Sequence, residues 1–400
     1  MSTIRTISAT EILDSRKKPT LRVEVTTDAG SGSFDVPSGA STGSREACEL
    51  RDAQGAMSSA VRAIHEEIAP ALIGMDPQDQ RAIDARMIEL DGTEHKSRLG
   101  GNSLIGISIA TARAAAQSNS VPLHEHLKTL ATIPPSRATP HLFVNLINGG
   151  KHASGGSPIQ EHQIVTLALD AHEALEHAMR TERALADILT EKHILPAHGD
   201  EGGVVFPVST IEEPFAILAE AIDAAHLNDQ VVIGVDAAAS SFYEKGSYAL
   251  LGVPHSSDDL LGLYASLSKS FNVQFLEDPF EENSLVAFSE LHHALPSLTI
   301  IGDDLTTTNP RSIKAAAEAN AISAVIIKPN QIGTLSETLD AMAMARSQNV
   351  HCIVSHRSGE TMDDFLGDLS VAFGVFGLKA GAPSAPERAI KYKRLLELLS

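Results

Sequence analysis

The sequence predicts an α/β protein in which a small N-terminal α+β domain precedes a β/α barrel. Two observations predict this fold class. The first part of the chain opens with alternating strand patterns joined by turn residues, and short apolar segments alternate with helical periodicity through the second half. At 400 residues the chain also exceeds one ordinary domain. We therefore expect two domains, at residues 1–133 and 134–400.

The N-terminal domain is expected to contain an antiparallel sheet followed by helices. Three segments have the pattern of strands, with a turn at Asp28-Ala29-Gly30 before the last one: 3–14, 21–27 and 32–36. Helical periodicity then covers much of residues 45–131. Residues 132–140 are the best candidate for a linker, because three prolines interrupt regular structure there.

The C-terminal domain begins with two strands and two long helical segments. The strands are expected at 141–147 and 162–167, and the helices at 171–192 and 210–226. Regular strand–helix alternation follows, with six strands expected at these positions: 231–235, 273–276, 298–302, 324–327, 352–354 and 376–378. A plain eightfold alternation would not predict a domain that starts with two strands and two helices.

Each of these six strands ends in an ionisable side chain. In a parallel β/α barrel the carboxyl ends of the strands share one rim, and the active site lies there. One aspartate after a strand usually caps the next helix, but capping does not account for two lysines and a His-Arg pair. We therefore expect a single site formed by these side chains: Asp236, Glu277, Asp303, Lys328, His356, Arg357 and Lys379.

The three carboxylates of this set predict a cation site. Two like unit charges about 4 Å apart repel by about 4 kcal/mol at an effective dielectric of 20. Oxygen ligands without a nearby thiolate or a close histidine pair favour a hard ion, above all Mg²⁺. A solvated acidic rim explains any one of Asp236, Glu277 and Asp303, but it explains the three together poorly. A lysine that faces a metal-bound carboxylate substrate, such as Lys328, suggests proton removal next to that carboxylate.

Loops supply further candidates. Glu201 is flanked by glycines, Glu161 follows Gln160 at the start of a strand, and His152 follows Gly149-Gly150-Lys151. An ordinary turn position would explain each of these residues taken alone. The loop at residues 37–43 consists of small residues and is able to move, but it lacks the lysine of a phosphate-binding P-loop.

Composition excludes several classes of function. The formal charge of −20 argues against binding to nucleic acids or anionic membranes. No run of 18 apolar residues predicts a membrane span, and no apolar segment near the first residues predicts a signal peptide. Two cysteines far apart, Cys48 and Cys352, exclude a disulfide framework and favour a reducing, cytoplasmic location.

Several runs of residues resemble a known family from end to end. The most specific are Ser355-His356-Arg357-Ser358-Gly359-Glu360-Thr361 and Asn330-Gln331-Ile332-Gly333 with Lys328 before it. The others are Leu13 to Arg16, Pro37 to Gly43, Glu49 to Asp52, Asn145 to Gly150, Gly199 to Gly203, Glu277 to Phe280 and Gly302 to Leu305. With these runs the sequence resembles the enolase family, the phosphopyruvate hydratases. The resemblance implies a small α+β domain followed by a barrel of the order ββαα(βα)6.

The resemblance also implies a reaction and the residues that perform it. The implied reaction is the reversible, Mg²⁺-dependent dehydration of 2-phosphoglycerate to phosphoenolpyruvate in glycolysis and gluconeogenesis. Lys328 would remove the C2 proton and Glu201 would protonate the departing C3 hydroxyl. Two Mg²⁺ ions would be bound. Asp236, Glu277 and Asp303 would hold the first ion, and Ser41, on the mobile loop, would help to hold the second.

The other positions implied to bind substrate surround these groups. Arg357 and Ser358 would hold the phosphate and Lys379 the carboxylate region. The full implied set is His152, Gln160, Glu161, Glu277, Asp303, Lys328, His356, Arg357, Ser358 and Lys379. Members of the family usually form homodimers or assemblies of dimers.

The sequence departs from the usual family pattern at two places that bear on the structure. Lys17 and Lys18 stand where the family usually has Gly-Asn, and His162 and Gln163 stand where it usually has Phe-Met. Two alternatives remain open: a superfamily enzyme that acts on another acid, and a degenerate paralogue that only binds. Competition by inorganic phosphate tests the first, and a Mg²⁺-dependent rise in ultraviolet absorbance from the enol product tests the second.

Overall fold

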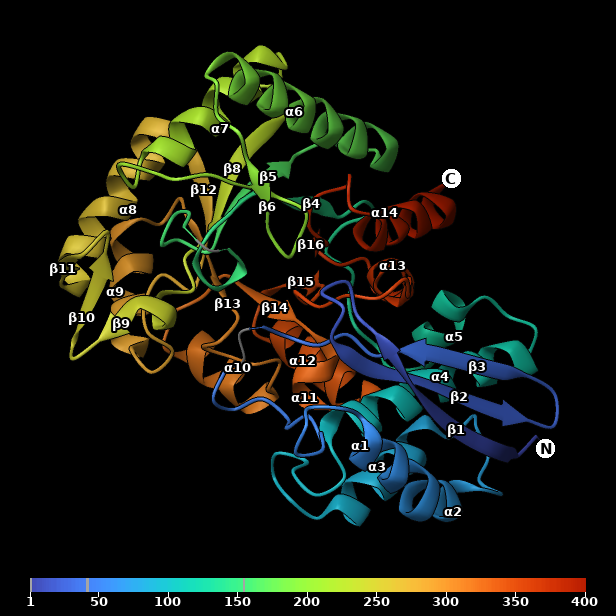
Figure 1. Ribbon diagram of the computed structural model, residues 1–400. Coiled ribbons are helices and arrows are strands. Elements are labelled where there is room, and N and C mark those ends of the chain that lie inside the picture. Colours follow the sequence, from blue (N-terminus) through green and yellow to red (C-terminus); the bar gives the residue numbers. More distant parts are fainter. Residues whose placement is uncertain (1, 41–42, 154) are drawn as a thin grey trace.

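The N-terminal part of the chain is a three-stranded antiparallel sheet covered by helices. The computed structural model describes residues 2–40, 43–153 and 155–400. Strands β1 (Ile4–Leu13), β2 (Pro19–Thr27) and β3 (Ser31–Asp35) pair in sequence order (Figure 1). The helices that follow are α1 (Ser58–Ala63), a π-helical turn at Ile64–Ile68, α2 (Ala69–Leu72), α3 (Gln80–Asp91), α4 (Gly101–Ser118) and α5 (Leu123–Leu130).

Burial of one face of the sheet explains how α4 packs. Leu21, Val23 and Val25 alternate along β2 and are fully buried against α4, as expected of a strand with one solvated face. At Gly32 on β3, a Cβ atom would overlap the Ala110 carbonyl of α4. The glycine therefore lets the helix lie close on the sheet.

The C-terminal part is a closed barrel of eight strands. The strands are β4 (His141–Asn148), β5 (Glu161–Thr166), β8 (Val231–Asp236), β12 (Val273–Glu277), β13 (Thr299–Gly302), β14 (Ala324–Ile327), β15 (His351–Ser355) and β16 (Gly377–Lys379). They pair in that order, and pairing of β16 with β4 closes the ring. Strand β5 is antiparallel to both of its neighbours, and the other pairings around the ring are parallel. The predicted fold class and the order ββαα(βα)6 are confirmed.

Helices surround the barrel (Figure 1). They are α6 (Ala171–Glu191), α7 (Glu213–Ala224), α8 (Ser257–Phe271), α9 (Leu285–Ala294), α10 (Pro310–Glu318), α11 (Pro329–Ile332), α12 (Leu335–Ser347), α13 (Phe365–Ala372) and α14 (Pro386–Leu399). Side chains such as Phe143, Phe275 and Ile326 fill the interior. Across residues 2–40, 43–153 and 155–400, no helix has the length and apolar character needed to cross a membrane.

Short strands and turns were not predicted. Strands β6 (Ala197–His198) and β7 (Val204–Val205) flank the loop that carries Glu201. A small separate sheet contains β9 (Tyr243–Glu244), β10 (Ser247–Leu250) and β11 (Val253–His255), and 3-10 turns lie at Gly150–His152 and Ala239–Phe242.

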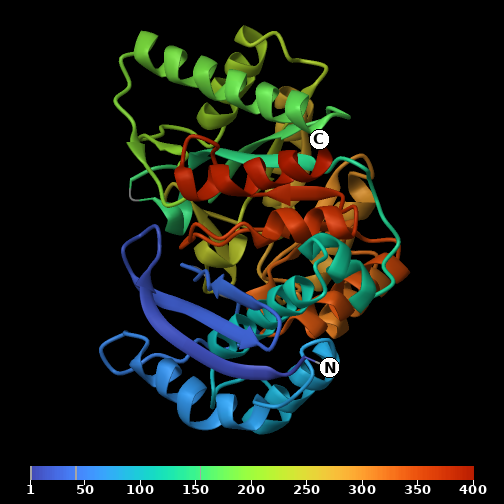
Figure 2. The ribbon, with the colours of Figure 1, turned by 90° about the vertical axis from the view of Figure 1, so that its right-hand side faces the viewer.

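The N-terminal part lies against the rim of the barrel that carries the strand ends. Helices α4 and α5 contact α11, α12 and α13 (Figures 1 and 2). Ser38 forms a backbone bridge with Gly359, and Arg45 donates to the Leu305 carbonyl at 2.9 Å. The loops of the N-terminal part therefore form one wall of any site at this rim.

The prediction of helix over much of residues 45–131 is wrong at 45–57, which form a loop. The loop's backbone is partnered by other segments: the Ala47 amide donates to the Gln331 carbonyl at 2.8 Å, and the Leu50 amide donates to Asn102 Oδ1 at 2.9 Å. These long-range bonds satisfy the groups that a helix would otherwise pair internally.

The turn between β1 and β2 contains the first departure from the family pattern. Lys17 has a φ of +59°, whereas Lys18 does not have a positive φ. Asp14 Oδ1 closes the turn by accepting from the Arg16 and Lys18 amides at 2.8 and 2.9 Å. A residue with a side chain is strained in the left-handed region by about 1–2 kcal/mol.

We predict that Lys17→Gly stabilises the protein by about 0.5–1 kcal/mol, because relief of this strain exceeds the extra chain entropy of glycine. Urea unfolding followed by circular dichroism measures the change. Lys18→Gly is the matched control and is expected to be neutral or destabilising. Equal effects of the two substitutions would contradict the prediction.

Candidate active site

The strand ends bring the predicted ionisable residues to one rim. Asp236, Glu277 and Lys379 are the last residues of β8, β12 and β16. Because β5 runs antiparallel to its neighbours, its first residue, Glu161, lies at the same rim and pairs in register with Asp236. Asp303 and Lys328 follow β13 and β14 directly.

The Lys379 ammonium group is surrounded by carboxylates. Its Nζ lies 3.0 Å from Asp236 Oδ2, 2.8 Å from Glu277 Oε2 and 3.3 Å from Glu161 Oε1. Burial lowers the pKa of Lys379, but the carboxylates outweigh burial and raise this pKa well above its ordinary value. The lysine therefore stays protonated and acts as the counter-ion of the cluster.

A second lysine pairs with the third predicted metal ligand. Lys328 Nζ forms a short ion pair with Asp303, whose other oxygen accepts from Gln331 Nε2 at 2.9 Å. Burial raises the pKa of Asp303, but Lys328 outweighs it, so the pKa of this carboxyl lies below its ordinary value. Burial likewise lowers the pKa of Lys328, and Asp303 more than offsets that effect.

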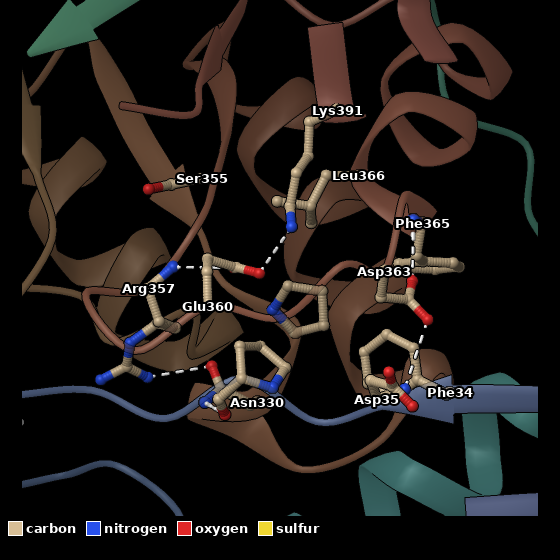
Figure 3. Close-up of a pocket in the computed structure, with 12 residues that line it drawn as sticks. Phe34, Asp35, Asn330, Ser355, Arg357, Glu360, Asp363, Phe365, Leu366 and Lys391 are labelled. Carbon is tan, nitrogen blue, oxygen red and sulfur yellow. Dashed lines mark hydrogen bonds and ion pairs between the residues drawn. The ribbon is translucent and has the colours of Figure 1, made fainter. Parts of the chain in front are cut away.

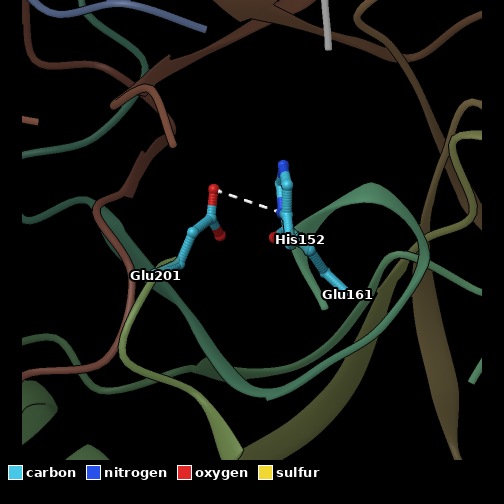
Figure 4. A group of neighbouring side chains, drawn as sticks. All are labelled: His152, Glu161 and Glu201. Atoms are coloured by element: carbon cyan, nitrogen blue, oxygen red, sulfur yellow. Dashed lines mark ion pairs between the residues drawn. The ribbon is translucent and has the colours of Figure 1, made fainter. Parts of the chain in front are cut away.

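Glu201 lies between His152 and His356, and Figure 4 shows its contact with His152. Its Oε1 lies 3.5 Å from His152 Nδ1 and 3.4 Å from His356 Nε2, and Asn145 Nδ2 donates to its Oε2 at 2.9 Å. Burial lowers the pKa of His152 and lowers the pKa of His356 to about 4. Both of these nitrogen atoms are buried and make no protein hydrogen bond, so they are free to contact a polar atom of a ligand.

The two glutamates have pKa values that are pushed apart. Burial, followed by the negative charge of Glu201, raises the pKa of Glu161 well above its ordinary value. Burial alone would raise the pKa of Glu201, but the neighbouring polar and charged groups of His356, His152 and Arg388 outweigh burial and hold this pKa well below the usual range. Of the two, Glu161 is therefore the carboxyl that more readily takes up a proton, and His152 Nδ1 lies within 3.8 Å of both carboxylates.

The Arg357 guanidinium group is also buried at this site. Arg357 Nη1 contacts Glu46 Oε2 and Asn330 Oδ1, each at 2.9 Å, and the second of these bonds is visible in Figure 3. Ser358 Oγ accepts from the Ala40 amide at 2.6 Å, and Arg16 Nη1 lies 3.3 Å from it. The N-terminal part thus supplies partners to both predicted phosphate-binding residues.

One narrow cavity joins these groups. Its walls contain nine predicted residues and one that was not predicted, Ser355: His152, Gln160, Glu161, Glu201, Lys328, Ser355, His356, Arg357, Ser358 and Lys379. Asp236, Glu277 and Asp303 lie behind Lys379 and Lys328 and do not line it. The predicted metal ligand Ser41 lies outside the described residues.

Acidic residues form close groups at this rim. Within the described part of the chain, two groups of three have ligand atoms within 4.8 Å of one another: His152–Glu161–Glu201 and Asp278–Asp303–Asp304. The predicted trio Asp236, Glu277 and Asp303 is not one of these two groups: Asp236 and Glu277 both contact Lys379, and Asp303 contacts Lys328. Oxygen donors nevertheless dominate this region, which fits a hard divalent cation.

Sequence reasoning missed several residues of the site. Asn145 fixes Glu201, Glu46 pairs with Arg357, and Gln331 holds Asp303. Asn145 and Gln331 lie inside runs that resemble the family, which was the available signal. Glu46 lies in a segment predicted as helix, and nothing in its sequence neighbourhood indicated a role.

Comparison with known proteins shows the family of this chain. A family model described as "Enolase, N-terminal domain" matches residues 4–127, and one described as "Enolase, C-terminal TIM barrel domain" matches residues 137–399. The chain belongs to the enolase family. A protein named "Enolase" from Metallosphaera sedula is 41% identical over 99% of this chain and 95% of its own length. "Enolase" from Methanothrix thermoacetophila is 42% identical over 99% of this chain and 95% of its own length. "Enolase B" from Dictyostelium discoideum is 41% identical over 99% of this chain and 94% of its own length.

His162, where enolases usually have phenylalanine, lies on the opposite face of β5 from the site. It is fully buried, packs edge-on against Phe215 with ring centroids 4.8 Å apart, and has Nδ1 3.3 Å from the Ile147 carbonyl oxygen. Burial lowers the pKa of His162 to about 4. The folded protein therefore holds this imidazole neutral where the unfolded chain would protonate it.

We predict that His162→Phe makes folding less sensitive to acid. The folded pKa of about 4 lies below the ordinary 6.5, so the stability present above pH 6.5 is lost as the pH falls from there toward 4. Between pH 7 and pH 5 this histidine costs about 2 kcal/mol, and phenylalanine removes that cost. Urea unfolding at the two pH values measures it, with exposed His293→Phe as the control. An unchanged pH dependence in His162→Phe would refute the prediction.

Proposed function

We propose that this chain catalyses the reversible dehydration of 2-phosphoglycerate to phosphoenolpyruvate in glycolysis and gluconeogenesis. As a member of the enolase family the chain is a lyase, a phosphopyruvate hydratase. The observation that carries the assignment of roles is that Lys328 and Glu201 line one cavity together with the anion-binding Arg357 and Lys379. A base, an acid and two anion-binding groups are what elimination next to a carboxylate requires.

The proposed base is Lys328. In the ligand-free arrangement its ammonium group is paired with Asp303. Engagement of Asp303 by a cation would weaken this pair, and the pKa of Lys328 would then fall toward the value that burial favours. The neutral amine would remove the C2 proton of the substrate.

The proposed acid is Glu201, which would donate a proton to the departing C3 hydroxyl. Burial and the charge of Glu201 raise the pKa of Glu161, which makes Glu161 the proposed proton store, and His152 Nδ1 lies within 3.8 Å of both carboxylates. His152 and Glu161 would therefore return a proton to Glu201. The unpaired Nδ1 of His152 and Nε2 of His356 mark where the hydroxyl oxygen would sit.

We propose that two Mg²⁺ ions complete the site. Asp236, Glu277 and Asp303 would hold the first, and Ser41 would help to hold the second together with substrate oxygens. When bound, the ions neutralise the carboxylate groups and stabilise the extra negative charge that forms after loss of the C2 proton. Support comes from the donor set, since buried Asp236 and Glu277 have the Lys379 ammonium as their shared cation and supply only oxygen ligands.

The substrate's anionic groups would be bound at both ends of the cavity. Arg357 and Ser358 would hold the phosphate, which suits the geometry of a guanidinium group. Lys379 would hold the carboxylate region, and Gln160 and His356 would line the pocket between them.

Three further proposals concern organisation. The domain boundary is proposed between residues 133 and 134, which agrees with the two family matches at 4–127 and 137–399. A homodimer, or an assembly of dimers, is proposed because members of the family usually form such assemblies. A cytoplasmic location is proposed because Cys48 and Cys352 are both free thiols, as a reducing compartment would keep them.

The assigned roles predict different effects at C2 and C3. Lys328→Ala is expected to abolish both dehydration and exchange of the C2 proton with solvent, because the base is lost. Glu201→Gln is expected to lower dehydration by about 10²-fold or more but to retain C2 exchange, because only the acid is lost. Absorbance of the enol product measures dehydration, and proton NMR in D₂O measures exchange.

These roles would be contradicted if Glu201→Gln lost C2 exchange to the same extent as dehydration while its Mg²⁺ binding and fold stayed intact. Glu182→Gln supplies the control. Glu182 lies on α6, accepts a hydrogen bond from the Ser384 hydroxyl, and does not line the cavity.

A further inference from the structure

The first turn of α14 inserts one arginine between the two loops that carry the proposed catalytic groups. Arg388 is completely buried. Its guanidinium Nη2 donates to the Asp200 carbonyl at 2.8 Å and to the Ser358 carbonyl at 2.7 Å. Its Nη1 donates to the Arg357 carbonyl at 2.6 Å and contacts His356 Nδ1 at 2.7 Å. A single side chain therefore ties the loop of Glu201 to the loop of Arg357 and Ser358.

The contact with His356 determines which ring nitrogen carries the proton. A guanidinium group can only donate hydrogen bonds, so Nδ1 of His356 must accept. The neutral imidazole therefore carries its hydrogen on Nε2. That atom is buried, has no hydrogen-bond partner, and lies 3.4 Å from Glu201 Oε1. His356 thus presents a donor toward the carboxylate and the cavity.

We propose that Arg388 is a positioning residue for the acid half of the reaction. By fixing the Nε2–H form of His356 and the backbone before Glu201, it keeps Glu201 in the orientation needed at C3. Without it, Nδ1 could carry the hydrogen, and Nε2 would direct a lone pair at an ionised carboxylate. This inference rests on the proposed role of Glu201 and adds a residue that does not touch the substrate.

The geometry restricts the effect to one side of the cavity. Arg388 makes no contact with Lys328, which is fixed instead by Asp303 and, through its backbone amide, by Thr308 Oγ1 at 3.0 Å. Loss of the guanidinium should therefore impair C3 chemistry and phosphate binding while sparing the proposed base. A general weakening of the fold would impair both halves equally.

Arg388→Lys tests this proposal in the full-length protein with Mg²⁺. Lysine keeps the charge but lacks the planar fork that reaches His356 and the three carbonyl groups together. We expect dehydration kcat to fall by about 10²-fold, KM to rise, and C2 proton exchange to fall by less than about tenfold, so that the ratio of exchange to dehydration increases. Arg394→Lys is the matched control, since Arg394 lies on the same helix and binds Asp368 at 2.7 Å.

The proposal would be overturned if folded Arg388→Lys showed the wild-type ratio of C2 exchange to dehydration. It would also be overturned if Arg388→Lys and the control Arg394→Lys showed the same ratio. If the variant is too unstable, Arg388→Gln and ¹⁵N NMR of the histidine rings provide the second measurement. The wild-type spectrum is expected to show His356 as the Nε2–H tautomer, and a wild-type Nδ1–H tautomer would also overturn the proposal. Absence of C2 exchange in the wild-type protein would instead refute the proposed function.

Discussion

The placement of the Lys379 ammonium group among Asp236, Glu277 and Glu161 is the interaction on which the site depends. Carboxylates buried at such distances repel one another strongly, so they need a cation or a proton. In the ligand-free protein Lys379 contacts three of the acids and Lys328 pairs with Asp303, and burial raises the pKa of both Glu161 and Glu277 well above the ordinary value. A metal ion that bound the same acids would weaken or replace their contacts with Lys379 and Lys328. The electrostatic state of the cavity is therefore set by a balance that a divalent cation and an anionic substrate can change together.

The architecture explains how so many charges can be gathered without unfolding the chain. Each group stands at the end of a strand whose interior is apolar, as in β14 with Ala324–Ile327 fully buried. The reversed direction of β5 brings Glu161 to the rim that the parallel strands use. The N-terminal part covers this rim and contributes Glu46 to Arg357 at 2.9 Å. Burial on all sides is what allows each ion pair to act strongly.

Much of this arrangement could be predicted from the sequence. The second-half strands are short, apolar and bounded by charged residues, so both their existence and the shared rim followed from local pattern. The loop at 45–57 could not be predicted, because its helical periodicity is overridden by bonds to Gln331 and Asn102 far along the chain. For the same reason nothing local indicated Arg388, whose partners lie about 30 or more positions away along the chain. The opposite pKa shifts of Glu161 and Glu201 depend on burial and on the groups packed around them, which sequence spacing does not contain.

We infer that Lys379 is the counter-ion, in the ligand-free protein, of the carboxylates proposed to bind Mg²⁺. Calorimetric titration of Mg²⁺ at pH 8, without substrate, into the wild-type protein and Lys379→Met tests it most directly. Removal of the competing ammonium group should tighten Mg²⁺ binding by about tenfold or more, since two like charges about 5 Å apart repel by several kcal/mol at an effective dielectric of 20. Unchanged or weaker Mg²⁺ binding in the folded variant would contradict the account.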